Sequence, residues 1–129
     1  MYCLDSNVII DFLRGDKKLA GKFSEVITSG AEIFITPITL CELYRGAYGY
    51  FDPQKKLEEV NYVISNFELL EFDSNSCGEF GKIHSKLEKS GKLIAEFDLI
   101  IASIVKAHDL ILVTRDKDFE NTGVKLEVW

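Results

Sequence analysis

The segment Phe97–Asp116 reads FDLIIASIVKAHDLILVTRD, and it contains the clearest indication of the fold class in the chain. Its first half, Phe97–Ala107, is apolar nearly all round, which predicts the most buried helix of the chain. The run Leu110–Thr114 that follows is short and apolar, and it predicts a buried strand. A buried helix that leads directly into a buried strand is typical of α/β proteins with a parallel sheet.

The rest of the chain alternates in the same way. Apolar runs predict further strands at 1–4, 33–35, 69–72 and 124–128, the last of them a fifth strand that the pattern leaves open. Helical spacing of apolar residues predicts helices over 8–13, 17–29, 37–47, 53–67 and 74–90, and Ser6 and Asn7 could cap the first of these. With 129 residues the chain fits one domain. We therefore expect a single domain over residues 1–129, a three-layer α/β/α sandwich around a mainly parallel sheet of four or five strands.

Composition limits the function classes. The 21 acidic residues exceed the 15 Lys and Arg residues, and the formal net charge is −6. Such a chain is a poor candidate for binding nucleic acid through bulk electrostatics, because phosphate contacts need Lys and Arg. The acidic surplus is either spread over a solvated surface or partly gathered at a site that needs a cation.

The remaining counts predict a cytoplasmic protein. Cys3, Cys41 and Cys77 are an odd number without a CxxC motif, which favours free, buried thiols in a reducing compartment. Charge at Asp5 and Asp11 argues against a secretory signal peptide. No apolar run approaches the ~20 residues of a membrane span.

Four carboxylates fall where a parallel sheet would gather them. Asp5 follows the first strand, Asp116 follows the strand at 110–114, Asp98 begins the most apolar helix, and Glu42 lies on the helix after Pro37. The carboxyl ends of parallel strands form the usual site of such sheets. Carboxylates that meet there repel one another unless a cation neutralises them, and oxygen-only ligation suits Mg²⁺ or Mn²⁺.

Each of these residues also has an ordinary interpretation. Asp5 could cap the first helix, and Asp98 could complement the helix dipole. Glu42 could be an exposed helix glutamate, and Asp116 and Asp118 could be turn residues. The joint placement, rather than any single residue, indicates a site.

The sequence resembles the PIN domain, and most closely the VapC-type toxins of bacterial and archaeal toxin–antitoxin pairs. Four segments carry the resemblance in order and spacing: Leu4-Asp-Ser-Asn-Val-Ile-Ile10, Thr39-Leu-Cys-Glu-Leu43, Asp98-Leu-Ile-Ile-Ala102 and Val113-Thr-Arg-Asp-Lys-Asp-Phe119.

The resemblance implies a metal-dependent endoribonuclease that uses Mg²⁺ or Mn²⁺, forms a homodimer and is inhibited by a small antitoxin protein. It assigns metal ligation to Asp5, Glu42 and Asp98. Asp116 takes the more variable fourth position, with Asp118 as the alternative. Two polar residues, Asn7 and Thr114, match positions that orient the site. Phe97 departs from the family, in which many members have a polar residue before the aspartate.

Five basic residues are candidates for RNA binding, of which Arg45 and Arg115 are expected near the site: Arg14, Arg45, Arg115, Lys82 and Lys86. The lysines share one helix face and could equally form a solvated surface. RNA would then be held by local basic patches and bridging metal rather than by net charge.

Two other functions remain open at this point. A phosphoacceptor receiver domain is also a small acidic α/β protein, and Asp73 follows the third strand where its aspartate could lie. The segment after the first strand, however, supplies one carboxylate where such a domain has a pair. The third alternative is a PIN-like interaction protein without catalysis, against which the four filled acidic positions argue.

Overall fold

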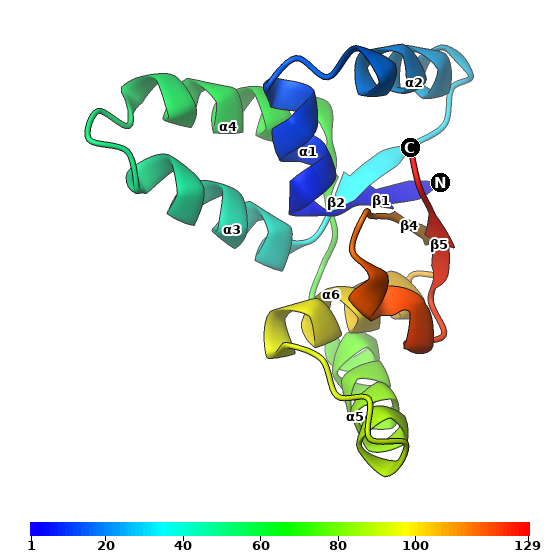
Figure 1. The fold of residues 1–129 in the computed structure, drawn as a ribbon. Helices are drawn as coiled ribbons and strands as arrows, with labels where there is room; N and C mark the ends of the chain where they lie inside the picture. Colours follow the sequence, from blue (N-terminus) through cyan, green and yellow to red (C-terminus); the bar gives the residue numbers. More distant parts are fainter.

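A computed structural model describes all residues, 1–129, and contains one five-stranded sheet whose strands are all parallel (Figure 1). The strands are β1 (Tyr2–Leu4), β2 (Ile33–Ile35), β3 (Glu68–Leu69), β4 (Ile111–Val113) and β5 (Lys125–Glu127), in the spatial order β3-β2-β1-β4-β5. The helices are α1 (Ser6–Leu13), α2 (Lys17–Thr28), α3 (Pro37–Tyr48), α4 (Gln54–Asn66), α5 (Ser74–Lys89) and α6 (Glu96–Ala107), followed by a short 3₁₀ helix, η1 (Lys117–Asn121). The sheet with helices on both faces confirms the expected α/β fold.

The two faces of the sheet carry separate hydrophobic cores, because successive side chains of a strand point to opposite faces. Leu4 of β1 packs in a core with α1, α2, α3 and α4, whereas its neighbour Cys3 packs in a core with α5 and α6. In the same way Val113 of β4 joins the first core and Leu112 the second. Helices α3 and α4 form a hairpin that projects away from the sheet (Figure 1).

Helix α6 is the most buried helix, as its apolar sequence predicts. Half of its residues are buried, and Ile101, Ala102, Ile104 and Val105 have no exposed surface. Its axis begins beside the site described below, so this packing fixes the position of Asp98 in its first turn. None of the helices combines the length and the apolar sequence that a membrane-spanning segment needs.

The structure corrects three local predictions. The third strand is Glu68–Leu69 rather than residues 69–72, because only these two residues pair with β2 at the sheet edge before the chain turns toward α5. Helix α1 is capped by Asp5, and Ser6 is its first residue rather than its cap. Cys3 is a buried free thiol as expected, but Cys41 and Cys77 are exposed, because they lie on the outer faces of α3 and α5.

Candidate active site

Asp5 lies at the carboxyl end of β1 with only 3% of its surface exposed, and both of its carboxylate oxygens are held. The backbone N–H of Ser6 donates to Oδ1 at 2.8 Å, and the hydroxyl of Thr114 donates to Oδ2 at 2.8 Å. Asp5 therefore caps α1 and is fixed to the end of the neighbouring strand β4 at the same time. Burial raises the pKa of Asp5, while these two hydrogen bonds act in the opposite direction.

Thr114 links Asp5 to the loop that follows β4. It is 3% exposed, and its hydroxyl oxygen also accepts the backbone N–H of Asp116 at 3.0 Å. Asp116 in turn caps η1, because its Oδ1 accepts the N–H of Asp118 at 2.9 Å. One hydroxyl thus places two of the candidate carboxylates relative to each other.

Glu42 reaches the same end of the sheet from α3. The hydroxyl of Ser6 donates to its Oε1 at 3.2 Å, which ties α1 to α3. Arg45, one turn further along α3, lies 3.9 Å from the other carboxylate oxygen. Partial burial and the nearby charge of Asp5 raise the pKa of Glu42.

Ser6 is a site residue that the sequence pattern does not reveal. The pattern predicts only a helix cap at this position, although a hydroxyl directly after Asp5 in a strand-to-helix turn is a signal that could have identified it. Its contact with Glu42 joins residues 36 positions apart, so the sequence pattern alone contains no sign of the pairing.

Asp98, Asp116 and Asp118 form the tightest group of carboxylates, with one oxygen of each within 4.8 Å of the others. Partial burial raises the pKa of Asp98 to about 6, and the charges of four other acids add to that effect in the order Asp116, Asp5, Glu42 and Asp118. Five carboxylates therefore act on one another at the carboxyl end of the sheet.

This donor set fits a hard divalent cation. All of the available ligand atoms are carboxylate oxygens, which Mg²⁺ and Mn²⁺ prefer, and a cation would relieve the mutual repulsion that raises the pKa of Asp98. The two histidines lie elsewhere. His84 stacks on Phe80 of its own helix α5, and His108 contacts the carbonyl of Ile104 at the opposite end of α6.

The expected orienting residues differ in their positions. Thr114 makes the contacts described above, whereas Asn7 is exposed in the first turn of α1. Two hydroxyls donate to carboxylates of the cluster, that of Ser6 to Glu42 and that of Thr114 to Asp5.

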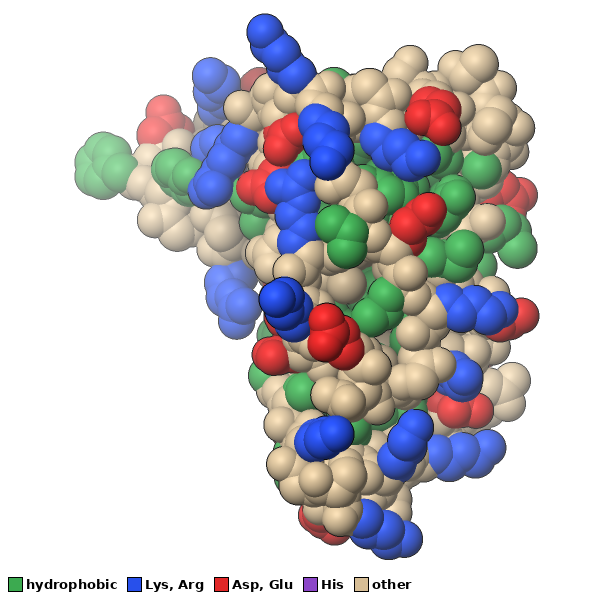
Figure 2. Space-filling view, turned by 45° about the vertical axis from the view of Figure 1, so that its right-hand side comes forward, with side chains coloured by type: hydrophobic (Ala, Val, Ile, Leu, Met, Phe, Trp, Pro, Cys, Tyr) green, Lys and Arg blue, Asp and Glu red, His purple; other side chains and the backbone are tan.

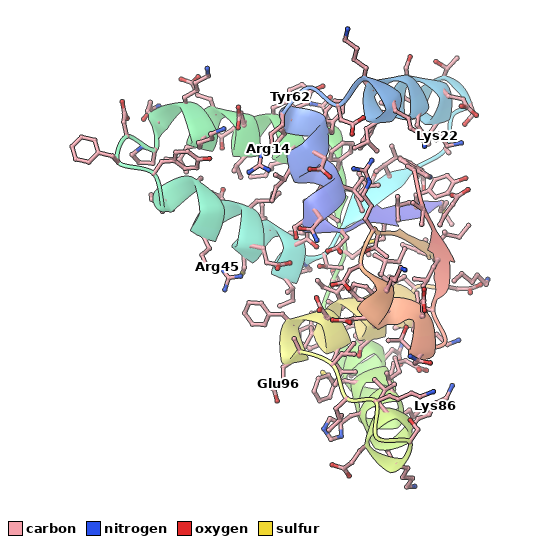
Figure 3. The ribbon with its side chains drawn as sticks, in the orientation of Figure 1. Arg14, Lys22, Arg45, Tyr62, Lys86 and Glu96 are labelled. Atoms are coloured by element: carbon pink, nitrogen blue, oxygen red, sulfur yellow. The ribbon has the colours of Figure 1, made fainter.

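The candidate RNA-binding residues do not gather into one basic surface. Lys and Arg side chains alternate with Asp and Glu over the face shown in Figure 2. Arg45 lies beside Glu42, and Arg14 and Glu42 both line a groove between α1, α3 and α4. Figure 3 shows Arg14 at the end of α1 and Arg45 on α3. Lys82 pairs with Glu79 on α5, and Lys86 lies on the same helix, well apart from Arg45 (Figure 3).

Arg115 is engaged inside the fold. Its guanidinium lies 2.7 Å from the carboxylate of Asp11 and 3.6 Å from that of Asp16, and it donates to the backbone carbonyl of Trp129 at 3.1 Å. Its charge is thus already paired with α1, with the residue before α2 and with the C-terminal residue.

Asp73 has the geometry of a helix cap. Its Oδ1 accepts both the backbone N–H and the hydroxyl of Ser76 at 2.9 Å, and these bonds lower its pKa. The acidic cluster lies around Asp98, and Asp73 is not part of it. This arrangement favours a structural role for Asp73 over that of a phosphoacceptor.

Comparison with known proteins gives matches along the whole chain. The chain is 29% identical to "Ribonuclease VapC2" from Haemophilus influenzae, with 99% of this chain and 97% of that protein covered. It is 28% identical, with the same coverage, to the "tRNA(fMet)-specific endonuclease VapC" from Salmonella typhimurium. The crystal structure of DNA-bound VapBC from Salmonella typhimurium contains a chain with a TM-score of 0.90 and 27% identity, covering 99% of this chain and 97% of that one.

The PIN domain family model matches residues 2–125, which include all five carboxylates of the cluster. This match agrees with the parallel sheet order and with the positions of the acids at the ends of β1 and β4 and at the start of α6. The chain belongs to the PIN domain family.

Proposed function

We propose that the protein is a metal-dependent endoribonuclease. The observation that carries the proposal is the group of five carboxylates at the carboxyl end of the sheet, where partial burial and then the charges of the other four acids raise the pKa of Asp98 to about 6. Asp5, Glu42, Asp98 and Asp116 would hold Mg²⁺ or Mn²⁺. Asp118, which lies within 4.8 Å of both Asp98 and Asp116, is the alternative fourth ligand.

The metal ligands and the residues that position them have different roles in the proposed reaction. A bound divalent ion supplies a water of lowered pKa and positive charge for the phosphodiester and the leaving oxygen. Thr114 keeps Asp5 and Asp116 in fixed relative positions. The hydroxyl of Ser6 holds Glu42 of α3 against the start of α1. Attack by a water that a bound divalent ion activates needs no covalent protein nucleophile, so we assign the reaction to direct attack by water.

We further propose that the protein is the toxin of a toxin–antitoxin pair and acts in the cytoplasm as a homodimer. The resemblance to VapC-type toxins and the match to a chain of VapBC from Salmonella typhimurium support this assignment. Glu42 of the acidic cluster is one of the residues that line the groove between α1, α3 and α4, so an antitoxin segment seated there would lie beside the site. The two relatives described as RNA-cleaving enzymes support RNA as the substrate.

The test is cleavage of labelled RNA in the presence of Mn²⁺ by Asp5→Asn and Asp98→Asn. Each change keeps the shape of the side chain and removes a charged ligand, so we expect the rate to fall by about 100-fold or more, as for loss of a group that stabilises the transition state. Asp109→Asn is the matched control, because Asp109 is exposed and its positive φ of 52° suits asparagine. Undiminished cleavage by both site variants would rule out the proposal.

A further inference from the structure

Phe97 is an exposed aromatic residue placed directly before a candidate metal ligand. It occupies the first turn of α6, next to Asp98, and 43% of its surface is exposed although it is a large apolar side chain. Further along the same helix, Leu99 and residues 101–105 are buried, and the apolar ones among them pack in the core that α6 shares with the sheet and α5. The exposed ring therefore lies at the margin of the acidic cluster.

Arg45 reaches that ring from the other side of the site. Its side chain is 71% exposed, and its guanidinium carbon lies 5.7 Å from the centroid of the Phe97 ring. Figure 3 shows Arg45 pointing from α3 toward the start of α6, where Glu96 is labelled. Because Glu42 and Asp98 belong to the same two helices, the Arg45–Phe97 pair spans the edge of the cluster between these two carboxylates.

The chemistry of the pair suits a nucleotide. Aromatic rings and guanidinium planes both stack on unpaired nucleobases, and a guanidinium also binds phosphate oxygens. The Arg45 guanidinium lies over the face of the Phe97 ring at cation–π distance, so this ring face is open to a cationic or aromatic partner. A phenyl ring has no hydrogen-bonding group, so it would bind a base without reading its edge.

We propose that Phe97 and Arg45 form a subsite that binds an unpaired nucleobase and its phosphate next to the scissile bond of RNA. The ring stacks on the base, and the guanidinium supplies positive charge for the phosphate beside the carboxylates. The subsite rests on the proposed ribonuclease function and adds a substrate requirement to it, namely that the nucleotide beside the cut is not paired.

A purely structural role predicts different behaviour. In that case Arg45 would only offset the charge of Glu42, from which it is 3.9 Å distant, and Phe97 would only cover the first turn of α6. An ion pair this exposed is weak, and it does not require an aromatic partner. Substitution of the ring would then change stability or metal binding and leave the recognition of a base unaltered.

The decisive experiment is a cycle that combines Phe97→Leu with an abasic nucleotide in the RNA. The substrate is a fluorescent single-stranded RNA cut at one mapped position, with the abasic nucleotide placed on either side of the cut. Stacking on an aromatic side chain is worth about 1–3 kcal/mol per base, so we expect Phe97→Leu to raise KM about 10-fold with little change in kcat. For the wild type, the abasic RNA should raise KM by the same factor when the missing base lies on one particular side of the cut. Combining Phe97→Leu with that abasic RNA should raise KM no further.

Control variants separate stacking from folding. Phe97→Tyr keeps the ring and should restore KM. Phe51→Leu removes a fully exposed ring at the tip of the α3–α4 hairpin and should leave KM unchanged. The rise in Tm caused by Mn²⁺ should be equal in the wild type and Phe97→Leu, whereas a structural role at Asp98 would reduce it.

Failure of this proposal is distinguishable from failure of the ribonuclease assignment. If the wild type cuts no RNA, the ribonuclease proposal fails, and binding of the same RNA with metal chelated still tests the subsite. The subsite is overturned if the wild type and Phe97→Leu bind this RNA with equal affinity. It is also overturned if, during cleavage, the variant and the abasic nucleotide raise KM independently of each other. Arg45→Gln should weaken RNA binding and reduce its salt dependence, and an unchanged salt dependence overturns the assigned role of Arg45.

Discussion

At the scale of the residue, Asp5 shows how one side chain serves the fold and the site together. One of its oxygens caps α1 through the N–H of Ser6, and the other accepts the hydroxyl of Thr114. From the sequence, capping and metal ligation are alternative roles for Asp5, but the two oxygens of a carboxylate allow both. A buried carboxylate with both oxygens hydrogen-bonded keeps its position before any cation binds.

Asp98→Asn is expected to stabilise the metal-free protein at neutral pH. The folded pKa of Asp98 is about 6, above the unfolded value, so the ionised form is disfavoured by folding and stability falls as the pH rises from about 4 through 6. The shift of about two units corresponds to ~3 kcal/mol, which solvent screening and the favourable helix dipole reduce to about 1 kcal/mol. Urea unfolding in EDTA should show this gain at pH 7 and no difference near pH 4. A less stable variant at pH 7 would contradict the prediction.

Thr114→Val tests the hydroxyl that joins two carboxylates. The change keeps the shape of the side chain but removes the donor to Asp5 and the acceptor for the N–H of Asp116, and it leaves buried groups unpaired. We expect a loss of about 1–3 kcal/mol in the free energy of unfolding and weaker Mn²⁺ binding, measured by urea titration and calorimetry. Thr114→Ser retains the hydroxyl and should recover most of both. Equal Mn²⁺ affinity in the wild type and Thr114→Val would show that the hydroxyl does not position the site.

At the scale of the element, the loop after β4 is more constrained than its sequence indicates. Thr114 and Asp116 face the site, while Arg115 between them pairs with Asp11 and Asp16 and bonds to the carbonyl of Trp129. The Trp129 ring packs edge-on against Tyr2 and Phe23, with ring centroids 5.1 and 5.4 Å apart. The C-terminal residue is thereby fixed against β1 and α2, and Arg115 connects it to the site loop.

Arg115→Met should therefore act on stability rather than on RNA affinity. Two partly exposed ion pairs and one hydrogen bond are lost, which we expect to lower the free energy of unfolding by about 1–2 kcal/mol. Arg115→Lys cannot reproduce the several contacts of the planar guanidinium, so its free energy of unfolding should lie between those of the wild type and Arg115→Met. Urea unfolding and RNA binding with metal chelated measure the two effects separately. Weaker RNA binding at unchanged stability would reverse the assignment and return Arg115 to the RNA-contacting residues.

The elements differ in how well sequence could predict them. Helix α3 follows from Thr36-Pro37, a hydroxyl cap before a proline, and α6 follows from its continuous apolar surface. The edge strand β3 contains two residues, Glu68 and Leu69, both exposed, so no burial pattern marked its limits. The 3₁₀ helix η1 depends on the cap formed by Asp116, which a turn-like sequence does not distinguish from an ordinary loop.

At the scale of the whole molecule, topology predicted the place of the site but not its internal contacts. Acids that follow β1 and β4 had to meet, because these strands are neighbours in a parallel sheet. The bond from Ser6 to Glu42 required the packing of α1 on α3, and the closeness of Asp118 to Asp98 required η1. Such contacts depend on helix positions that a linear pattern does not contain.

Part of the net charge of −6 is concentrated where a cation would bind, so cation binding should stabilise the protein. Mn²⁺ at 100 times its dissociation constant should stabilise the protein by about 2.7 kcal/mol and raise Tm by several degrees, and EDTA should reverse the rise. Asp98→Asn should abolish the rise, whereas Asp109→Asn, on the exposed turn after α6, should preserve it. Comparing Asp116→Asn with Asp118→Asn identifies the fourth ligand, since the variant with the smaller rise has lost it. An undiminished rise in Asp98→Asn would mean that Mn²⁺ binds elsewhere on the acidic surface.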